Sequence, residues 1–287
     1  MSQPLKRKVI VVAGPTASGK SDFSVELAIK NNGEIISADS RQVYKGLDIG
    51  TGKITQSEMK GVPHHMLDIV NINDEFSVAT FKALATPILQ DILARNRTPI
   101  ICGGTGQYID ALIYDTETPN VGPNHELRKV LESKNEDELF ADLAEKDPYR
   151  ADTVDRYNKV RLIRALEIVD ELGFVPPLHT PTLLYETEFY LMSPSRELLR
   201  TRIEERLEKR LDVGMIEEVK NIHEQGFDSE KMKRFGLEYE SIAKYLEGKL
   251  TEEEMKQDII TKSMQYVKRQ ETWNKKYLPI AKLIEVL

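Results

Sequence analysis

Short apolar runs alternate with helical patterns along the first third of the chain. Residues 9–13 form a continuous apolar run, which is typical of a strand buried on both faces. Residues 34–38 and 99–102 are two further short strands, and the stretch that contains Phe23 and Leu27 has the apolar spacing of a helix. This alternation predicts a parallel sheet covered by helices, so the expected fold class is α/β.

The pattern changes between about Asp115 and Leu184. The turn-rich sequence TETPNVGP leaves the first segment, and PPLHTPT forms a linker at the far end. Between them we predict helices over residues 126–133, 136–145 and 160–172, the last of which ends at Gly173. We therefore expect a helical insertion domain over residues 115–184, within a core formed by residues 1–114 and 185–287.

The last third returns to the sheet and then becomes helical. Residues 189–192 predict one more strand, and Thr251 with Glu254 forms a capping-box signature before a long helix. An apolar residue recurs every four positions and predicts a helix with one buried stripe, at Leu199, Ile203, Leu207 and Leu211.

Composition limits the classes of function. The 287 residues carry a net charge of −7, so any contact with RNA must use local basic patches. No apolar stretch is long enough to cross a membrane, and the short N-terminal run passes straight into a glycine motif, which favours a strand over a signal peptide. The single cysteine, Cys102, excludes an intrachain disulfide, and we interpret it as a small buried residue rather than a nucleophile. We expect a cytoplasmic protein.

The strongest chemical signal is the sequence VVAGPTASGKS, which fits the P-loop pattern G-x-x-x-x-G-K-[ST]. Glycines let successive backbone N–H groups converge on a phosphate, and the following helix points its positive end at the same anion. The lysine adds a mobile charge, and the hydroxyl of Ser21 can bind a magnesium ion. The candidate diphosphate or nucleotide site comprises Gly14, Pro15, Thr16, Ala17, Ser18, Gly19, Lys20 and Ser21.

Two further motifs follow the second and third predicted strands. DSRQVY begins at Asp39, and GGTGQY begins at Gly103. The carboxyl ends of parallel strands line the ligand crevice, so Asp39 should face the P-loop. Asp39 is equally open to interpretation as a turn or cap residue, or as the substrate-binding aspartate of a small-molecule kinase.

Taken together, the motifs resemble those of one family. GPTASGKS, DSRQVYKGLDIGTGK, PHHMLDI, FSVATF and GGTGQYI occur in this order, followed by VRLIRALEI, RIEERLEKRLDVGMIEEV and KRQETW. This series is similar to the tRNA dimethylallyltransferases, also called tRNA isopentenyltransferases, and it extends over nearly the whole chain. The resemblance implies a P-loop NTPase-like parallel sheet core with a helical insertion domain.

The resemblance also implies a reaction. The family transfers a dimethylallyl group from dimethylallyl diphosphate to the N6 amine of an adenosine beside the tRNA anticodon. By this resemblance Asp39 is the general base, while Thr16 and Arg206 hold the diphosphate together with a magnesium ion on Ser21. Such roles suit the chemistry, because the amine must lose a proton and the leaving group gathers negative charge.

The resemblance further implies contacts to the tRNA anticodon stem-loop. The implied residues are Asp39, Ser40, Arg41, Gln42, Thr105, Arg128, Val160, Arg161, Leu162, Ile163 and Arg164. In the last long helix a basic and aromatic face recurs at helical spacing, at Lys262, Tyr266, Arg269 and Trp273. Such a face can serve phosphate and base, although a mixed helix with Trp273 partly in the core explains the pattern equally well.

Three other functions share parts of this pattern. An adenylate isopentenyltransferase would prenylate a free nucleotide with a similar core, but the helical insertion and KRQETW favour tRNA. A P-loop small-molecule kinase or a nucleotide-binding module needs no DS-x-Q element at Asp39. We therefore expect a magnesium-dependent prenyltransferase that acts on tRNA as a monomer, without a membrane partner.

Overall fold

The computed structural model describes residues 8–116, 119, 121–177 and 180–286. The N-terminal residues 1–7 lie outside the described residues, as do parts of the turn-rich exit and of the linker, at 117, 118, 120, 178 and 179. The chain forms two compact units, one from Met1–Asp115 with Leu183–Leu287 and the other from Thr116–Thr182. The larger unit is described first.

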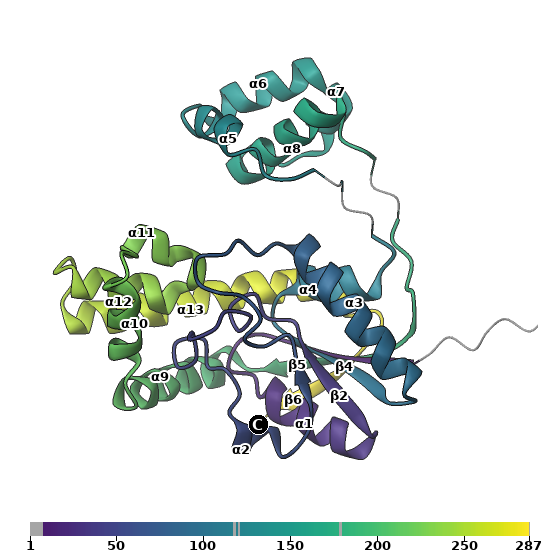
Figure 1. The fold of residues 1–287 in the computed structure, drawn as a ribbon, viewed down its shortest axis with the longest axis vertical. Coiled ribbons are helices and arrows are strands. Elements are labelled where there is room, and N and C mark those ends of the chain that lie inside the picture. The colour runs from purple at the N-terminus through teal and green to yellow at the C-terminus, as the bar shows by residue number, and fades with distance from the viewer. Residues whose placement is uncertain (1–7, 117–118, 120, 178–179, 287) are drawn as a thin grey trace, which may run out of the picture. The chain divides into compact units, whose positions relative to one another are not determined.

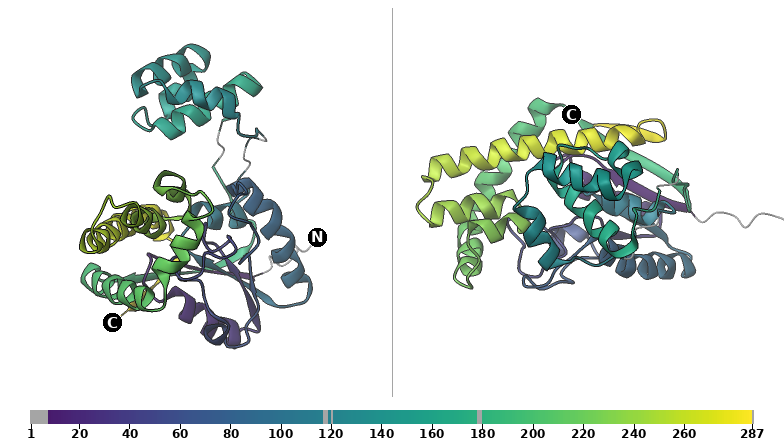
Figure 2. Two further views of the ribbon diagram at one scale, coloured as in Figure 1. Left: turned by 60° about the vertical axis from the view of Figure 1, so that its left-hand side comes forward. Right: turned by 90° about the horizontal axis from the view of Figure 1, so that it is seen from above.

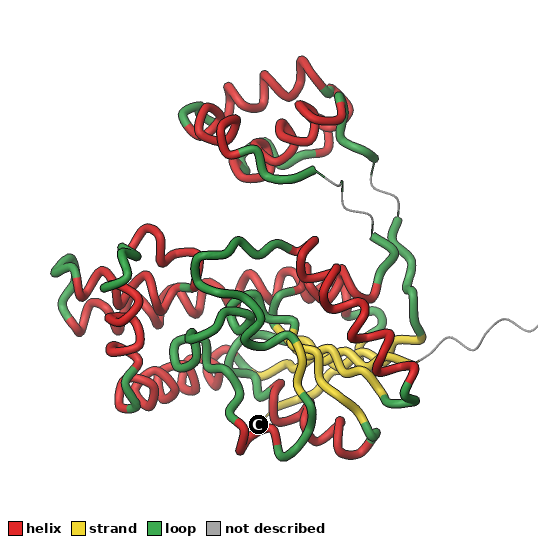
Figure 3. Tube along the Cα trace, in the orientation of Figure 1, coloured by secondary structure: helices red, strands yellow, loops and turns green. Residues whose placement is uncertain are grey.

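A parallel six-stranded sheet, yellow in Figure 3, forms the centre of the larger unit. Its strand order is β3-β2-β4-β1-β5-β6, and every pair is parallel. The strands are β1 (Lys8–Ala13), β2 (Gly33–Ser37), β3 (His64–His65), β4 (Thr98–Gly103), β5 (Glu186–Pro194) and β6 (Ala281–Val286). The predicted α/β class is confirmed, because each strand expected from an apolar run is present with slightly different ends.

The two edge strands, β3 and β6, were not predicted from the sequence. β3 has only two residues, which is too short for an apolar pattern. β6 alternates between half-buried and exposed side chains, so it lacks the continuous apolar run of the inner strands.

Helices cover both faces of the sheet (Figure 1). Along β1, Ile10 packs with Val25 of α1 (Lys20–Lys30) on one face, whereas Val9 packs with Phe81 of α3 (Val78–Ala94) on the other. Alternate residues of a strand point to opposite faces, so a fully apolar strand needs cover on both sides. The short helices α2 (Gln56–Met59) and α4 (Gly106–Ile113) complete this part.

The C-terminal helices build a second core beside the ends of the strands. The rotated views in Figure 2 show that the helices α12 (Leu237–Leu246) and α13 (Glu252–Asn274) lie side by side. In α9 the apolar stripe is buried at Leu199, Ile203 and Leu207 and half-buried at Leu211, and the capping box of Thr251 and Glu254 is formed at the start of α13. The elements are α9 (Arg196–Asp212), α10 (Met215–His223), α11 (Ser229–Met232), α12 (Leu237–Leu246) and α13 (Glu252–Asn274), with 3₁₀ turns at Lys233–Phe235 and Lys275–Tyr277. Among the described residues no helix is apolar and long enough to traverse a membrane.

The smaller unit is a bundle of four helices around its own apolar core. Its elements are α5 (His125–Glu132), α6 (Glu136–Lys146), α7 (Pro148–Thr153) and α8 (Lys159–Leu172). Gly173 ends α8 in the left-handed conformation, with φ of 80°. The short α7 was not predicted; it begins at Asp147, whose side chain accepts a hydrogen bond from the backbone N–H of Arg150.

A substitution of Gly103, at the end of β4, would test how tightly the ends of the strands are packed. A Cβ at this position would lie 2.1 Å from the carbonyl oxygen of Ala38, a backbone atom that cannot rotate away. Gly103→Ala should therefore lower the free energy of unfolding by about 1–3 kcal/mol. Gly122→Ala is the control, because its Cβ would meet nothing within 4 Å. Urea denaturation measures both, and equal stability of the two variants would contradict the packing described here.

Candidate phosphate-binding active site

The P-loop joins β1 to α1 in a curl that only glycine permits at its first position. Gly14 has φ of 150°, and a Cβ there would lie 2.8 Å from the Cβ of Met192. Gly19, just before α1, is left-handed with φ of 84°. The loop therefore points its backbone N–H groups and the positive end of α1 at the same place, where they can bind an anion.

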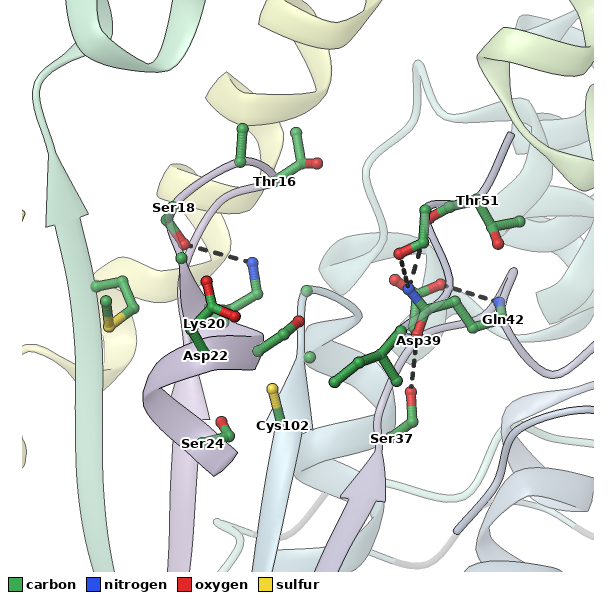
Figure 4. A pocket seen from close by; sticks show the side chains of 18 of the residues that line it. Thr16, Ser18, Lys20, Asp22, Ser24, Ser37, Asp39, Gln42, Thr51 and Cys102 are labelled. Atoms are coloured by element: carbon green, nitrogen blue, oxygen red, sulfur yellow. Dashed lines mark hydrogen bonds between the residues drawn. The ribbon is translucent and has the colours of Figure 1, made fainter. Parts of the chain in front are cut away.

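A pocket of about 520 Å³ opens at this place, entirely within the larger unit. Lys20, Asp39, Gln42 and Cys102 line it together with the loop residues from Thr16 to Ser21 (Figure 4). Gly14 and Pro15 shape the curl from outside this lining. The parallel sheet thus brings together the P-loop and both motifs that follow the next two strands.

Lys20 holds a positive charge at a costly position. Its Nζ donates hydrogen bonds to the carbonyl of Pro15 and, at 3.5 Å, to the hydroxyl of Ser18. The pKa of Lys20 is lowered to about 8, mainly by burial and to a smaller extent by the charge of Arg206, although Cys102 and Asp39 oppose the change. A bound anion would favour the charged form and reverse this cost.

Arg206 of α9 is the second cation at the pocket. More than a third of its side chain stays exposed, and it lines the pocket rather than joining a glutamate on its own helix. Among the described residues no ion pair of Arg206 is found. Burial by the surrounding protein lowers its pKa to about 10, and Arg210 adds to that effect. Gly52 makes room for it, because a Cβ there would lie 3.0 Å from an Arg206 nitrogen.

Asp39 lies across the pocket from Lys20 (Figure 4). Its Oδ1 accepts hydrogen bonds from the backbone N–H groups of Arg41, at 2.8 Å, and Gln42, at 3.3 Å. Asp39 is therefore a turn residue and a pocket residue at once, so the two interpretations of the sequence do not exclude each other.

Two neighbouring turns hold Asp39 in place. The Ser40 N–H donates to the hydroxyl of Thr105 at 3.1 Å, and the Thr105 N–H donates to the carbonyl of Ala38 at 3.1 Å. The Gln42 amide accepts from Ser37 and donates to the carbonyls of Thr51 and Gly52. Ser40, Gln42 and Thr105 thus lie around Asp39, as their expected role requires, but they also fix the turns.

The Arg41 side chain reaches away from Asp39, towards the C-terminal helices. Its guanidinium donates to the backbone carbonyl of Arg234, at the 3₁₀ turn before α12. This contact ties the Asp39 turn to the C-terminal helices.

Glu218 and Gln270 support the pocket, and the sequence analysis identified neither. The Glu218 carboxylate accepts from three successive backbone N–H groups, those of Asp48, Ile49 and Gly50, at 2.8–3.0 Å. It thereby shapes the loop that carries Gly52. A glutamate on an exposed-looking helix gives no sequence signal for such a contact.

Gln270 joins the P-loop to the third motif. Its Oε1 accepts from the Thr16 N–H at 2.8 Å, and its Nε2 donates to the Gly104 carbonyl at 3.1 Å. A Cβ on Gly104 would lie 2.2 Å from that Nε2, and one on Gly106 would lie 2.0 Å from Nε1 of Trp273. The glycines of GGTGQY therefore leave space for the side chains of KRQETW, and this explains why both motifs occur in one chain.

The expected basic and aromatic face of α13 is only partly available. Lys262 pairs with Asp258 at 2.7 Å and Glu240 at 3.3 Å, and Trp273 packs half-buried against Gly106. Tyr266 lines the pocket, and the Arg269 guanidinium lies 5.6 Å from the centre of its ring.

The floor of the pocket includes Cys102. Burial raises the pKa of its thiol. A neutral thiol is a poor nucleophile, which agrees with the expected structural role.

In the smaller unit, two expected RNA contacts form an internal ion-pair network. Arg128 donates to the buried carboxylate of Glu167 at 2.7 and 2.9 Å, and Arg164 donates to it at 3.3 Å. Both arginines keep about 37% of their side chains exposed. Val160 and Arg161 are exposed on α8.

Leu162 and Ile163 require a correction. Their side chains are 0% and 8% exposed and pack in the apolar core of the smaller unit. A direct side-chain contact with RNA is wrong for these two residues, because they face inward on α8. They can act only by holding the helix that carries their exposed neighbours.

The Gln270 bridge can be tested on the diphosphate site alone. Gln270→Leu leaves the Thr16 N–H and Gly104 carbonyl unsatisfied, at a cost of about 1–3 kcal/mol. We expect inorganic diphosphate to bind roughly five- to a hundredfold more weakly, measured by calorimetry. Gln265→Leu changes an exposed glutamine of the same helix and should bind normally. Unchanged affinity in Gln270→Leu would contradict the bridge.

The lowered pKa of Lys20 gives a pH signature. Lys20 is charged below pH 8 and loses its charge above it, so affinity for inorganic diphosphate should fall as the pH rises through about 8. The fall approaches about tenfold per pH unit if one proton is linked to binding. Lys20→Met removes this step and leaves only the ionisation of the ligand. Parallel pH profiles for the two proteins would show that Lys20 does not meet the anion.

The chain is similar to known proteins of one family. The family model described as IPP transferase matches residues 42–277. A tRNA dimethylallyltransferase of Anoxybacillus flavithermus is 42% identical over 95% of this chain and 89% of its own length. The solved tRNA isopentenylpyrophosphate transferase of Bacillus halodurans is 36% identical, with a TM-score of 0.73, over 98% of this chain and 90% of that one.

A solved eukaryotic dimethylallyltransferase acting on tRNA has a TM-score of 0.85 and 29% identity, over 97% of this chain and 74% of that one. The match extends over both the P-loop core and the C-terminal helices that close the pocket. The chain belongs to the IPP transferase family.

Proposed function

We propose that this protein transfers the dimethylallyl group of dimethylallyl diphosphate to the N6 amine of the adenosine 3′ to the anticodon in tRNA. It does so as a monomer, in the cytoplasm, with a magnesium ion. The observation that supports the proposal is one pocket lined by a P-loop with Lys20, by Arg206 and by the carboxylate of Asp39. Relatives named tRNA dimethylallyltransferases support the same assignment.

The cationic side of the pocket suits the leaving group. As the bond between the dimethylallyl C1 and the bridging oxygen breaks, its electron pair leaves with the diphosphate. Lys20, Arg206 and the N–H groups of the P-loop can receive this charge, and within the described part of the chain neither cation has an ion pair that must break first. Donors that are already in position lower the barrier because they need no reorganisation.

The anionic side suits the nucleophile. The adenine N6 lone pair is delocalised into the ring, so the amine becomes reactive only as its proton leaves. The Asp39 carboxylate takes that proton while N6 forms the new bond to C1. Oδ1 is engaged by two backbone N–H groups, which leaves Oδ2 to meet the amine.

The residues fit a magnesium ion at Ser21. This hydroxyl is exposed at the pocket, beside Asp22. Magnesium commonly binds through few protein ligands, with phosphate oxygens and water as the others, and supplies charge neutralisation of the phosphates. Lys20 and Ser21 would then share the diphosphate between them.

The RNA contacts fall on both units. Ser40, Gln42 and Thr105 surround Asp39, whereas Arg128, Val160, Arg161 and Arg164 belong to the smaller unit. We expect the first group to hold the target base and the second to contact the stem-loop. An adenylate isopentenyltransferase would have no use for the second group.

Substrate choice tests the proposal directly. The protein is incubated with radiolabelled dimethylallyl diphosphate, ATP and magnesium, and an unmodified anticodon stem-loop and AMP are offered side by side. We expect the label to appear in the stem-loop and not in AMP. We also expect no release of phosphate from ATP. Label in AMP alone would establish the adenylate enzyme, and ATP hydrolysis without labelled RNA would establish a kinase-like reaction.

Two substitutions of Asp39 separate its roles. Asp39→Asn keeps an oxygen for the two backbone N–H groups, so the melting temperature should not change. The single-turnover rate should fall by about 10²–10⁴-fold, which is the usual share of a general base. Asp39→Ala should show the same loss of rate and also lower stability by about 0.5–1.5 kcal/mol, because its hydrogen bonds to the backbone N–H groups of Arg41 and Gln42 are lost. A nearly normal rate in Asp39→Asn would refute the assignment of the base.

A further inference from the structure

One aromatic side chain lines the pocket, among the residues that the structure describes there: Tyr266, in the middle of α13. The other lining side chains are small, aliphatic, amide or charged, apart from the thioether of Met192 and the imidazole of His64. Tyr266 is half-buried, so part of its ring stays open to the pocket.

The surroundings of Tyr266 are polar at the hydroxyl and cationic on the ring. Its hydroxyl lies near Thr105 and Asp39. Burial, with the Asp39 charge as the next cause, raises the pKa of Tyr266 to about 12, so the phenol is neutral at physiological pH. The exposed Arg269 lies 5.6 Å from the ring centre, one helical turn along α13.

A base that reacts at N6 must leave its stack, and a loss of stacking in the RNA is offset where the enzyme provides a flat partner. An adenine whose amine meets Asp39 brings its ring into the space beside Thr105, where Tyr266 stands. Aromatic side chains in other proteins bind unstacked bases in this way, because every base has a π-face.

We propose that Tyr266 is the surface on which the target adenine stacks and that Arg269 contacts the adjoining phosphate. This inference rests on the proposed function, since it places the acceptor base of that reaction. The RNA partner is thus held by a ring and a cation from one helix, while Asp39 and Thr105 approach the edge of the base.

The test compares Tyr266→Phe, Tyr266→Leu and Arg269→Gln with the wild type. The probe is an anticodon stem-loop with 2-aminopurine at the target position, which has no N6 amine and fluoresces more when it is unstacked. The wild type and Tyr266→Phe should give equally quenched complexes. Tyr266→Leu should give a brighter complex and bind about ten- to a hundredfold more weakly.

Salt separates stacking from phosphate contact. Tyr266→Leu should leave the slope of log Kd against log salt concentration unchanged, because no counterion is involved. Arg269→Gln should reduce that slope by about 0.7–0.9, the value for one phosphate contact. Tyr266→Met replaces Tyr266→Leu if the latter melts at a lower temperature.

Each result bears either on the stacking role of Tyr266 or on the proposed function. Wild-type affinity and quenching in Tyr266→Leu would overturn the inference, and so would a loss in Tyr266→Phe as large as in Tyr266→Leu, because the hydroxyl would then matter and not the ring. Transfer of a dimethylallyl group to an unmodified stem-loop by the wild type is measured in parallel. Failure of that transfer overturns the proposed function itself, whereas transfer with normal binding by Tyr266→Leu overturns only the stacking role.

Discussion

The separation of unlike charges across one pocket governs the rest of this structure. Lys20 lies across the pocket from Asp39, and Arg206 also lines the pocket; among the residues that the structure describes, neither cation forms an ion pair with a carboxylate. Burial lowers the pKa of Lys20, so the folded protein holds this charge at a cost. An ion pair between Lys20 and Asp39 would stabilise the Lys20 charge, but it would also occupy the groups that a ligand needs. The arrangement is therefore understandable as one that a polyanionic ligand completes.

The fold keeps these groups apart by tying down the backbone between them. Parallel strands bring three turns to one edge of the sheet, and side chains from distant parts of the chain then lock each turn. Gln270 joins the P-loop to the turn after β4, and Glu218 fixes the loop that carries Gly52. Thr105 joins the turns after β2 and β4. Catalytic groups held in this way need little reorganisation during a reaction.

How much of this arrangement could be predicted from the sequence depends on how far apart along the chain the interacting residues lie. The P-loop and the inner strands depend on local pattern, so apolar runs and glycine spacing were sufficient to locate them. Glu218 and Gln270 act on backbone more than 160 residues away, and no local pattern encodes such contacts. β6 was missed because an edge strand is half-exposed. Leu162 and Ile163 were assigned to RNA from a motif, although their spacing on α8 turns them towards the core.

The central claim is that the pocket has a cationic half for the diphosphate and an anionic half for the amine. The most direct test is the affinity for inorganic diphosphate of Asp39→Asn and Arg206→Ala, measured by calorimetry at neutral pH. Removal of the Asp39 charge should leave this affinity unchanged or make it tighter, because one repulsive charge disappears. Removal of the Arg206 charge should weaken it by about ten- to a hundredfold. Weaker binding in Asp39→Asn, or normal binding in Arg206→Ala, would contradict the division of the pocket on which this account depends.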